Sequence, residues 1–350
     1  MKATGEPLVL LSERLAPITD DERRVELAGA RLTLAPLWNL DQIVENAANA
    51  DVVILGAVEP FDAAALDALP NLKAVVRRGV GTDNVDVTEA TRLGILVANV
   101  PDATVEEVSD QAFALLLALE RRIVPVDRAV HDGVWQHDPR GIQQVRADAR
   151  RLSELTLGVV GFGRIGQAVA RKGRPIYARI LAADPYISAE VAAANGAELV
   201  SIPELLASAD HVSLNAPATP ETRHLINATS IATMKPGAML VNTARGALVD
   251  EQAVIDAVAS GHLGGAGLDA TEHEPLPEGD PLLTAPGILL TAHSAAWSKT
   301  ATVDLARRSV DAALDLIAQR RPASIVNSEV LSSPNLRLSA LGNRTVQTLR

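Results

Sequence analysis

Leu157-Gly158-Val159-Val160-Gly161-Phe162-Gly163-Arg164-Ile165-Gly166 is the stretch that decides the fold. It reads as a buried strand running into a glycine turn that opens a helix, with the G-x-G-x-x-G spacing of a dinucleotide site. In that motif Gly161 permits the tight turn, Gly163 lets the backbone approach a pyrophosphate, and Gly166 lets the helix pack close to the strand. The first amides of the helix, at Arg164 and Ile165, then hold the phosphates.

A second apolar run strengthens this interpretation. Residues 180–183 are apolar and end in Asp184, which follows Gly166 by 18 residues. A carboxylate at this point accepts hydrogen bonds from the adenosine ribose and repels a 2′-phosphate. The alternative is that Asp184-Pro185 only starts a turn. The two features together predict a cofactor site that prefers NAD(H) to NADP(H).

Length and composition limit the remaining possibilities. A chain of 350 residues suggests two domains. The net charge of −11 argues against nucleic acid or an anionic membrane as a partner. The absence of cysteine excludes disulfides and thiolate chemistry. The N-terminal apolar run, residues 8–11, is too short for a signal peptide. We therefore expect a cytoplasmic protein.

Short apolar runs alternate with helix-like segments through most of the chain, which predicts parallel sheets joined by right-handed crossovers. The content of 47 % hydrophobic and 2 % aromatic residues suits parallel sheets covered by helices on both faces. The fold class is thus α/β with two doubly wound domains. The predicted strands of the first domain are 8–11, 31–35, 52–55, 74–77 and 95–98. Those of the second are 157–160, 180–183, 211–214, 239–241, 265–268 and 288–290.

Two long helices are predicted outside this alternation. The first runs from Thr104 to about Val130, and its middle, Phe113–Leu119, is apolar on nearly every side. Such a helix is usually buried, so we expect a connector between domains or between subunits. The polar stretch 131–151 reads as a surface arm. The second long helix, 300–319, is expected to return to the first domain, which gives domain boundaries of 1–103 plus 298–350 and 104–297. The tail 328–350 shows no period.

Several ordered blocks carry a resemblance that spans roughly residues 50–327. They are Arg78-Gly79-Val80-Gly81-Thr82-Asp83-Asn84-Val85-Asp86, the glycine motif with Asp184, Pro217-Ala218-Thr219-Pro220-Glu221-Thr222, Val241-Asn242-Thr243-Ala244-Arg245-Gly246, Gly267-Leu268-Asp269, Glu274-Pro275 and His293. In these blocks the chain resembles the D-isomer-specific 2-hydroxyacid dehydrogenase family. Within the family it is most similar to the C-terminal-binding-protein branch, in Arg77, the Val85-Asp86 region, Asn99-Val100-Pro101 with Val105-Glu106-Glu107, and the Trp297 neighbourhood. The resemblance implies a flavodoxin-like substrate domain, a Rossmann NAD-binding domain and an active site in the cleft between them.

The family's catalytic trio falls on Arg245, Glu274 and His293. Reducing a 2-oxo acid needs a hydride on the carbonyl carbon and a proton on its oxygen. Histidine donates protons near neutral pH, and a neighbouring carboxylate such as Glu274 favours the imidazolium. An arginine binds a planar carboxylate with both arms of its fork. Taken singly, each residue could instead be an ordinary surface, turn or packing residue, but all three follow predicted strands, where open α/β sheets bind ligands.

The resemblance also implies the remaining contacts. Gly79-Val80-Gly81 matches the loop whose amides hold the substrate carboxylate, and Arg77 matches an arginine that reaches the substrate. Asp269 matches the partner of the nicotinamide carboxamide. The other implied contacts are Val80, Ala216, Thr222, Thr243 and Ala244 for the cofactor and Trp297 for the substrate. Strand-end packing, or an Arg77-Arg78 pair in solvent, is the alternative. The histidines form no metal-binding spacing, and we expect no metal.

Three departures from the family pattern affect the pocket. Asn215 stands where a histidine is usual, Tyr177 stands where a glycine is usual, and Trp297 comes one residue later than the corresponding tryptophan. The predicted function is hydride transfer between NAD(H) and a 2-oxo acid/(R)-2-hydroxy acid pair, in a homodimer with Phe113–Leu119 at its interface. The alternatives are an NADH-responsive scaffold or corepressor, and the same fold acting on a small oxyanion such as phosphite.

Overall fold

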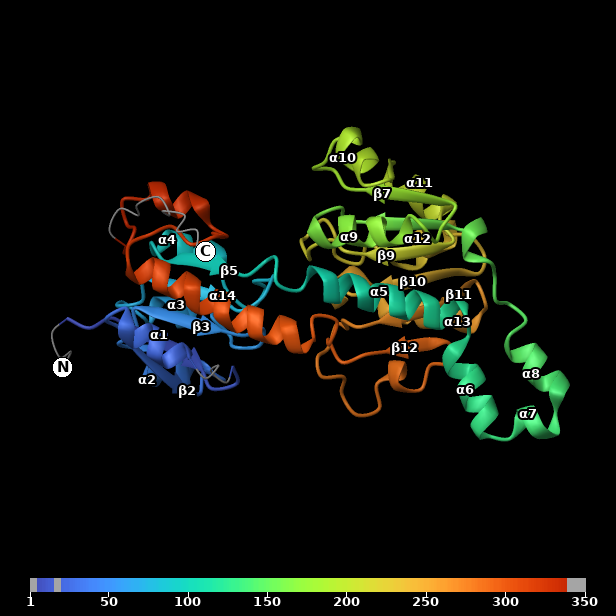
Figure 1. Ribbon diagram of the computed structural model, residues 1–350, viewed down its shortest axis with the longest axis horizontal. Coiled ribbons are helices and arrows are strands. Elements are labelled where there is room, and N and C mark those ends of the chain that lie inside the picture. The colour runs from blue at the N-terminus through green and yellow to red at the C-terminus, as the bar shows by residue number, and fades with distance from the viewer. Residues whose placement is uncertain (1–4, 16–19, 339–350) are drawn as a thin grey trace. The chain divides into compact units, whose positions relative to one another are not determined.

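The structure is a computed structural model that describes residues 5–15 and 20–338. It divides into two compact units, Met1–Thr104 with Ser298–Arg350 and Val105–Trp297. Each unit is a parallel sheet with helices on both faces (Figure 1). Among the described residues, no helix is both long and apolar enough to cross a membrane.

The first unit contains a five-stranded sheet in the order β2-β1-β3-β4-β5. All its strand pairs are parallel. This is the flavodoxin-like order, whose ligands bind beyond the carboxyl ends of the strands. The five predicted strands are confirmed, and their observed bounds are β1 Leu8–Ser12, β2 Arg31–Ala35, β3 Val52–Leu55, β4 Ala74–Arg77 and β5 Leu96–Asn99.

Two layers of helices cover this sheet. On one face lie α1 (Asp21–Leu27) and α14 (Lys299–Ile317), whose Val25 and Val310 join the core. The predicted return of the last long helix to the first domain is confirmed, since α14 packs on β3 and β4. The other face is covered by α2 (Leu40–Ala47), α3 (Ala63–Asp67) and α4 (Val87–Arg92).

The second unit contains a seven-stranded parallel sheet in the order β12-β11-β10-β9-β6-β7-β8. Its centre is the doubly wound order of a dinucleotide-binding fold, extended by one strand at the β12 edge. The observed strands are β6 Thr156–Val160, β7 Arg179–Ala183, β8 Glu198–Leu199, β9 His211–Leu214, β10 Ala238–Asn242, β11 Leu263–Leu268 and β12 Ile288–Leu290. Six of these were predicted. The edge strand β8 was missed because two residues make no apolar run.

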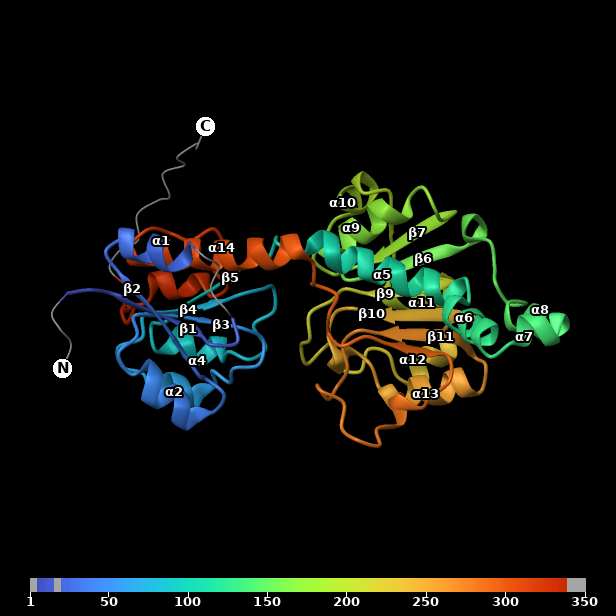
Figure 2. The same cartoon turned by 60° about the horizontal axis from the view of Figure 1, so that its bottom comes forward.

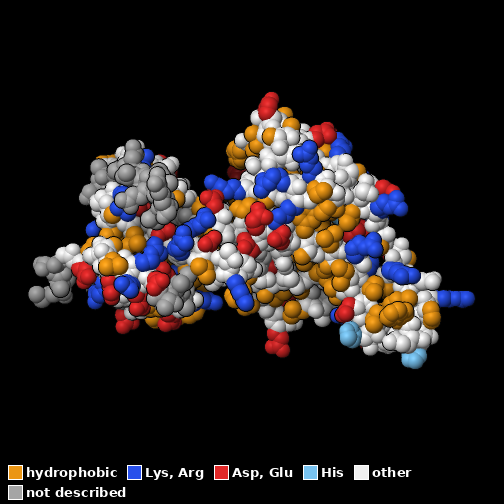
Figure 3. Space-filling view, in the orientation of Figure 1, with side chains coloured by type: hydrophobic (Ala, Val, Ile, Leu, Met, Phe, Trp, Pro, Cys, Tyr) orange, Lys and Arg blue, Asp and Glu red, His pale blue; other side chains and the backbone are white. Residues whose placement is uncertain are grey.

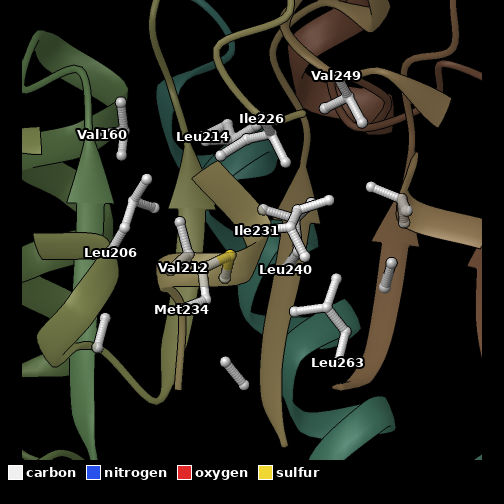
Figure 4. Close-up of a cluster of buried hydrophobic side chains, with 14 of the residues drawn as sticks. Val160, Leu206, Val212, Leu214, Ile226, Ile231, Met234, Leu240, Val249 and Leu263 are labelled. Carbon is white, nitrogen blue, oxygen red and sulfur yellow. The ribbon is translucent and has the colours of Figure 1, made fainter. Parts of the chain in front are cut away.

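Helices again cover both faces of the sheet (Figure 2). One layer is made by α5 (Val105–Glu120) and α9 (Arg164–Gly173). The opposite layer contains α11 (Ile202–Ser208), α12 (Ala228–Thr233) and α13 (Glu251–Ala259), and its core includes Leu206, Ile231 and Leu240 (Figure 4). The short α10 (Ala189–Ala194) lies between β7 and β8 in the chain.

The prediction of one continuous helix from Thr104 to Val130 is wrong. The helix α5 ends at Glu120, and Arg122 adopts a left-handed backbone with φ of 54°, which no helix can continue through. The expectation of a connector between domains or subunits also needs correction. Phe113, Leu115, Leu116 and Leu119 are buried in the core of their own unit, where α5 packs on β10 and β11.

The chain after α5 forms α6 (Ile123–His131) and then, within the predicted polar stretch 131–151, the short helices α7 (Val134–His137) and α8 (Pro139–Val145). A 3₁₀ turn, η1 (Leu152–Glu154), follows that stretch. We call residues 121–149 the arm. Hydrophobic side chains gather on its surface in Figure 3. Trp135, in α7, is 63 % exposed. Of the tail that had no predicted structure, η4 (Ser328–Ser332) is a 3₁₀ turn, and residues 339–350 lie outside the described residues.

Candidate active site

The glycine turn after β6 has the geometry of a phosphate cradle. Gly161 has φ of 82°, and a Cβ on it would lie 2.5 Å from the backbone nitrogen of Ala216. A Cβ on Gly166 would lie 2.1 Å from the carbonyl oxygen of Gly161. These two glycines are therefore required by the fold itself. A Cβ on Gly163 would meet nothing within 4 Å, so that glycine leaves open space at the N-terminus of α9. The turn fits a pyrophosphate.

Asp184 lies at the carboxyl end of the neighbouring strand β7. Its carboxylate accepts hydrogen bonds from the backbone nitrogens of Phe162 (2.7 Å) and Tyr186 (2.8 Å), which fix it beside the glycine turn. A hollow opens next to it. The hollow is lined by Ala183, Asp184, Pro185, Ile187, Leu199, Val200, Ser201, Ile202, Pro203 and Glu204. A carboxylate among apolar walls suits a nucleoside, whose base is apolar on its faces and whose ribose carries hydroxyls.

Polar side chains also follow β9 and β10. The Thr243 hydroxyl is buried and has no hydrogen-bond partner among the described residues, and neither has Oδ1 of Asn215. A buried polar atom without a hydrogen-bond partner destabilises the fold, so both atoms indicate a ligand that would form the missing hydrogen bonds. Thr222 differs, because its hydroxyl is used inside its own loop, donating to the Pro217 carbonyl at 2.7 Å.

The strongest contact of the site joins Glu274 and His293. Oε2 of Glu274 lies 2.6 Å from Nδ1 of His293, and Oε1 accepts a hydrogen bond from the Thr271 nitrogen at 3.1 Å. Both side chains are partly exposed. His293 follows β12 and has φ of 48°, an uncommon value for a residue other than glycine and one that recurs at functional sites.

The surroundings of Glu274 lower its pKa below the usual value. Partial burial acts in the opposite direction, but it is outweighed by the hydrogen bond and charge of His293, the Thr271 amide and the charge of Arg245. Glu274 is therefore ionised at neutral pH. Its negative charge lies 2.6 Å from the imidazole of His293.

Asp269 fixes the segment that carries His293. Its buried carboxylate accepts hydrogen bonds from the backbone nitrogens of Ser294 (3.0 Å) and Ala295 (2.9 Å) and a short one from the Thr291 hydroxyl. The Asp269 carbonyl accepts from the His293 nitrogen at 2.8 Å. The chain on both sides of the histidine is thus attached to Asp269. Sequence reasoning had assigned Asp269 only a cofactor contact.

Arg245 is held by a residue that sequence reasoning did not single out. Asn242, fully buried at the end of β10, accepts from the Ala244 nitrogen at 3.0 Å and donates to the Arg245 carbonyl at 2.8 Å. The 3₁₀ turn η2 (Gly246–Leu248) follows, and a Cβ on Gly246 would lie 2.0 Å from the Thr271 carbonyl carbon. This close approach brings the Arg245 loop against the loop of Glu274. A polar residue that ends a buried strand was the available signal for Asn242.

The first unit holds the other predicted substrate contacts. Arg77 ends β4, and Gly79 follows with φ of 144°, so close to the guanidinium that a Cβ would lie 1.5 Å from Nη1. Asn99 donates to the Val80 carbonyl at 2.7 Å, while Val80 and Gly81 reach the surface. Trp297, the last residue of the second unit, is 82 % exposed. The structure thus brings Arg245, Glu274 and His293 together in the second unit, and Arg77 and Gly79–Gly81 together in the first.

Comparison with known proteins gives a consistent result. A family model for the NAD binding domain of D-isomer specific 2-hydroxyacid dehydrogenases matches residues 113–295. The chain is 39 % identical over 292 residues to glyoxylate reductase of Korarchaeum cryptofilum, a match that covers 83 % of this chain and 86 % of that protein.

Two further relatives have different substrates in their names. The chain is 38 % identical over 291 residues to D-3-phosphoglycerate dehydrogenase of Mycobacterium tuberculosis, covering 82 % of this chain but spanning only 52 % of that protein. Among solved structures, the holo form of D-mandelate dehydrogenase from Rhodotorula graminis superposes with a TM-score of 0.83 at 28 % identity, covering 92 % of this chain and 98 % of that one.

Proposed function

The chain belongs to the D-isomer specific 2-hydroxyacid dehydrogenase family, and from this premise we propose that it interconverts a 2-oxo acid and an (R)-2-hydroxy acid with NAD(H). The observation that carries the proposal is the 2.6 Å contact between Glu274 and His293, beside Arg245. An imidazole held by a carboxylate, next to an arginine, is what the reduction of a 2-oxo acid requires.

His293 is the proposed proton donor. Nδ1 faces Glu274, so Nε2 is left to deliver a proton to the carbonyl oxygen of the substrate. Glu274 is ionised at neutral pH because its pKa is lowered, so its negative charge faces the ring that carries the proton. In the oxidation direction, the same nitrogen takes the proton back from the hydroxyl group.

Arg245 and the glycine loop of the first unit orient the substrate in this proposal. The guanidinium of Arg245 binds the substrate carboxylate and polarises the carbonyl that receives the hydride. The amides of Val80 and Gly81, together with Arg77, hold the carboxylate from the substrate domain, and Trp297 borders the pocket. Residues Met1–Thr104 with Ser298–Arg350 then form the substrate domain, and Val105–Trp297 the cofactor domain.

The cofactor residues are proposed from the same geometry. When bound, NADH supplies the hydride. The turn Gly161–Gly166, with the amides of Arg164 and Ile165, would hold its pyrophosphate, and Asp184 its adenosine ribose. The remaining contacts would come from Val80, Ala216, Thr222, Thr243, Ala244 and Asp269. Asp184 is also the reason to expect NAD(H) rather than NADP(H), because its charge repels a 2′-phosphate.

The first experiment is oxidation of NADH with a panel of 2-oxo acids, comparing the wild type with Arg245→Ala. We expect turnover in the wild type and a loss of about 10²-fold or more in kcat/KM for the variant, with NADH binding unchanged by fluorescence titration. Arg179→Ala is the matched control. Arg179 is the first residue of β7, so it lies at the amino ends of the strands, whereas Arg245 follows the carboxyl end of β10. Full turnover in Arg245→Ala would contradict the assignment.

Absence of turnover with every 2-oxo acid, while NADH still binds, would instead favour the scaffold or the oxyanion alternative. The closer resemblance to the C-terminal-binding-protein branch also stays a prediction. The proposal includes a cytoplasmic homodimer, as expected from the sequence.

A further inference from the structure

The carboxyl edge of the first sheet carries a buried acidic residue that the proposed mechanism does not use. Glu59 follows β3 and is 1 % exposed. Its Oε1 accepts a hydrogen bond from the Ser12 hydroxyl at 2.5 Å, and its Oε2 accepts one from the Gly56 nitrogen at 2.9 Å. Both oxygens are thus bound by the ends of β1 and β3. We call residues 56–60 the β3 loop.

The β3 loop lies beside the glycine loop that is proposed to hold the substrate carboxylate. Strands β3 and β4 are neighbours, and Leu55 pairs with Arg77. Asn84 ties the two loops together by donating to the carbonyls of Gly56 (3.1 Å) and Glu59 (2.7 Å). Held in this way, the β3 loop exposes an apolar side chain, that of Val58, which is 56 % exposed.

The positive charges at this edge are distributed unevenly. In the segments that follow the five strands, the sequence has only Arg14, Arg77 and Arg78. Arg14 stacks on Trp38, with its guanidinium carbon 4.6 Å from the ring centroid, on the β2 side of the sheet.

Arg78 turns toward α14, where its Nε donates to Ser309 at 3.1 Å. Burial, only partly offset by the charge of Asp21, lowers the pKa of Arg78 to about 10, which still leaves it charged. Of these three arginines, Arg77 is the one whose guanidinium overlies the glycine loop. In this unit, Arg77 is the cation that the proposed function assigns to the substrate carboxylate.

We propose that the β3 loop, braced by Glu59, selects 2-oxo acids whose side chain is uncharged. This inference rests on the proposed function, because it takes the substrate carboxylate to lie at Arg77 and Gly79–Gly81. The rest of the substrate then meets Val58, an apolar side chain on the loop that Glu59 braces. A second carboxylate or a phosphate would be desolvated there without a positive partner.

The test compares two isosteric substrates, 4-methyl-2-oxopentanoate and oxaloacetate, in which an isopropyl group replaces a carboxylate. We expect the wild type to have a kcat/KM at least about tenfold higher for the uncharged acid. Val58→Arg should shift this ratio toward oxaloacetate by about tenfold, because it adds the missing cation on an exposed position. Val58→Gln, of similar length but neutral, should leave the ratio unchanged.

Two results would overturn the inference. One is a wild type that reduces oxaloacetate as well as its uncharged isostere, and the other is an identical ratio in Val58→Arg and Val58→Gln. Either would leave the dehydrogenase assignment standing, because NADH would still be oxidised. Failure to oxidise NADH with any 2-oxo acid would remove the proposed function and this inference together.

Glu59 is a positioning residue in this account, and its variants need a separate readout. Glu59→Gln replaces one acceptor with a donor that faces the Ser12 hydroxyl or the Gly56 nitrogen, which loosens the β3 loop. We expect KM for the uncharged acid to rise with kcat little changed, since ground-state and transition-state binding weaken together. Ser12→Ala, a milder change, should act in the same direction. An unchanged KM in folded Ser12→Ala would contradict the bracing role.

Discussion

At the residue scale, opposing effects set the pKa of Glu274. Partial burial favours its neutral form, yet His293, the Thr271 amide and Arg245 together lower its pKa. The stabilisation from this pair is present above the ordinary pKa of a glutamate. It is lost as the pH falls through the lowered pKa.

Glu274→Gln should therefore lower kcat for 2-oxo acid reduction by about 10²-fold or more. The acid limb of its pH profile should also be lost, because Glu274, whose lowered pKa sets that limb, no longer titrates. The pH dependence of kcat/KM measures this change. Glu272→Gln is the matched control. Glu272 lies on the same loop as Glu274 and makes an equally short 2.6 Å contact, with His224 of another loop. A profile unchanged in Glu274→Gln would argue against the pair.

Among the elements, the arm is anchored by a buried polar network. Arg150 donates to Glu120 where the chain returns from the arm to the sheet (Nη2 to Oε2, 2.8 Å). His211 lies 2.8 Å from the same carboxylate through Nε2 and 2.7 Å from the Tyr177 hydroxyl through Nδ1. Glu120 and His211 are fully buried. Tyr177 therefore supplies a partner for a buried histidine.

Removing one member of this network should destabilise the fold. Arg150→Met leaves the buried Glu120 carboxylate without its cation and should lower the free energy of unfolding by about 3–5 kcal/mol. Arg151→Met, which removes only an exposed pair with Glu154, should cost at most about 1 kcal/mol. Urea denaturation of both variants makes the comparison, and equal losses would contradict the anchoring role.

The network also has a pH signature. Burial would raise the pKa of Glu120, but hydrogen bonds from His211 and Arg150 outweigh it and lower the pKa to about 2. Its contribution to stability is thus complete above the ordinary glutamate value and declines as the pH falls toward 2. Wild-type stability should fall with acidification across this window more steeply than that of Glu120→Gln.

At the scale of the whole molecule, each unit has its own sheet and its own pair of hydrophobic cores. The predicted dimer interface at Phe113–Leu119 loses much of its basis, because its large side chains, except for Leu117, are buried within the second unit. The arm, by contrast, exposes Ile123, Val124 and Trp135.

The predicted homodimer is tested by light scattering. We expect twice the mass of the 36.8 kDa chain, because exposed apolar side chains on a projecting segment are typical of an interface. Trp135→Glu should weaken the dimer, whereas Tyr186→Glu, at an aromatic outside the arm that is 94 % exposed, should not. A monomer in the wild type would reject the prediction.

The sequence by itself determined the two parallel sheets, because apolar runs and helical periods are local properties that tertiary contacts only reinforce. It also determined the glycine turn and Asp184, whose spacing follows from one strand-turn-helix unit. The trio Arg245, Glu274 and His293 was identified through a family resemblance.

Only the tertiary structure decided what holds these residues in place. Asp269 and Glu59 act through partners 26 and 47 positions away in the chain, and no local pattern encodes such pairings. The contacts of the buried His211 and the end of α5 at Glu120 also depend on residues far away in the chain. Propensity favoured a continuous helix there, but the chain turns at Arg122, and the arm that follows is closed by the long-range ion pair between Glu120 and Arg150.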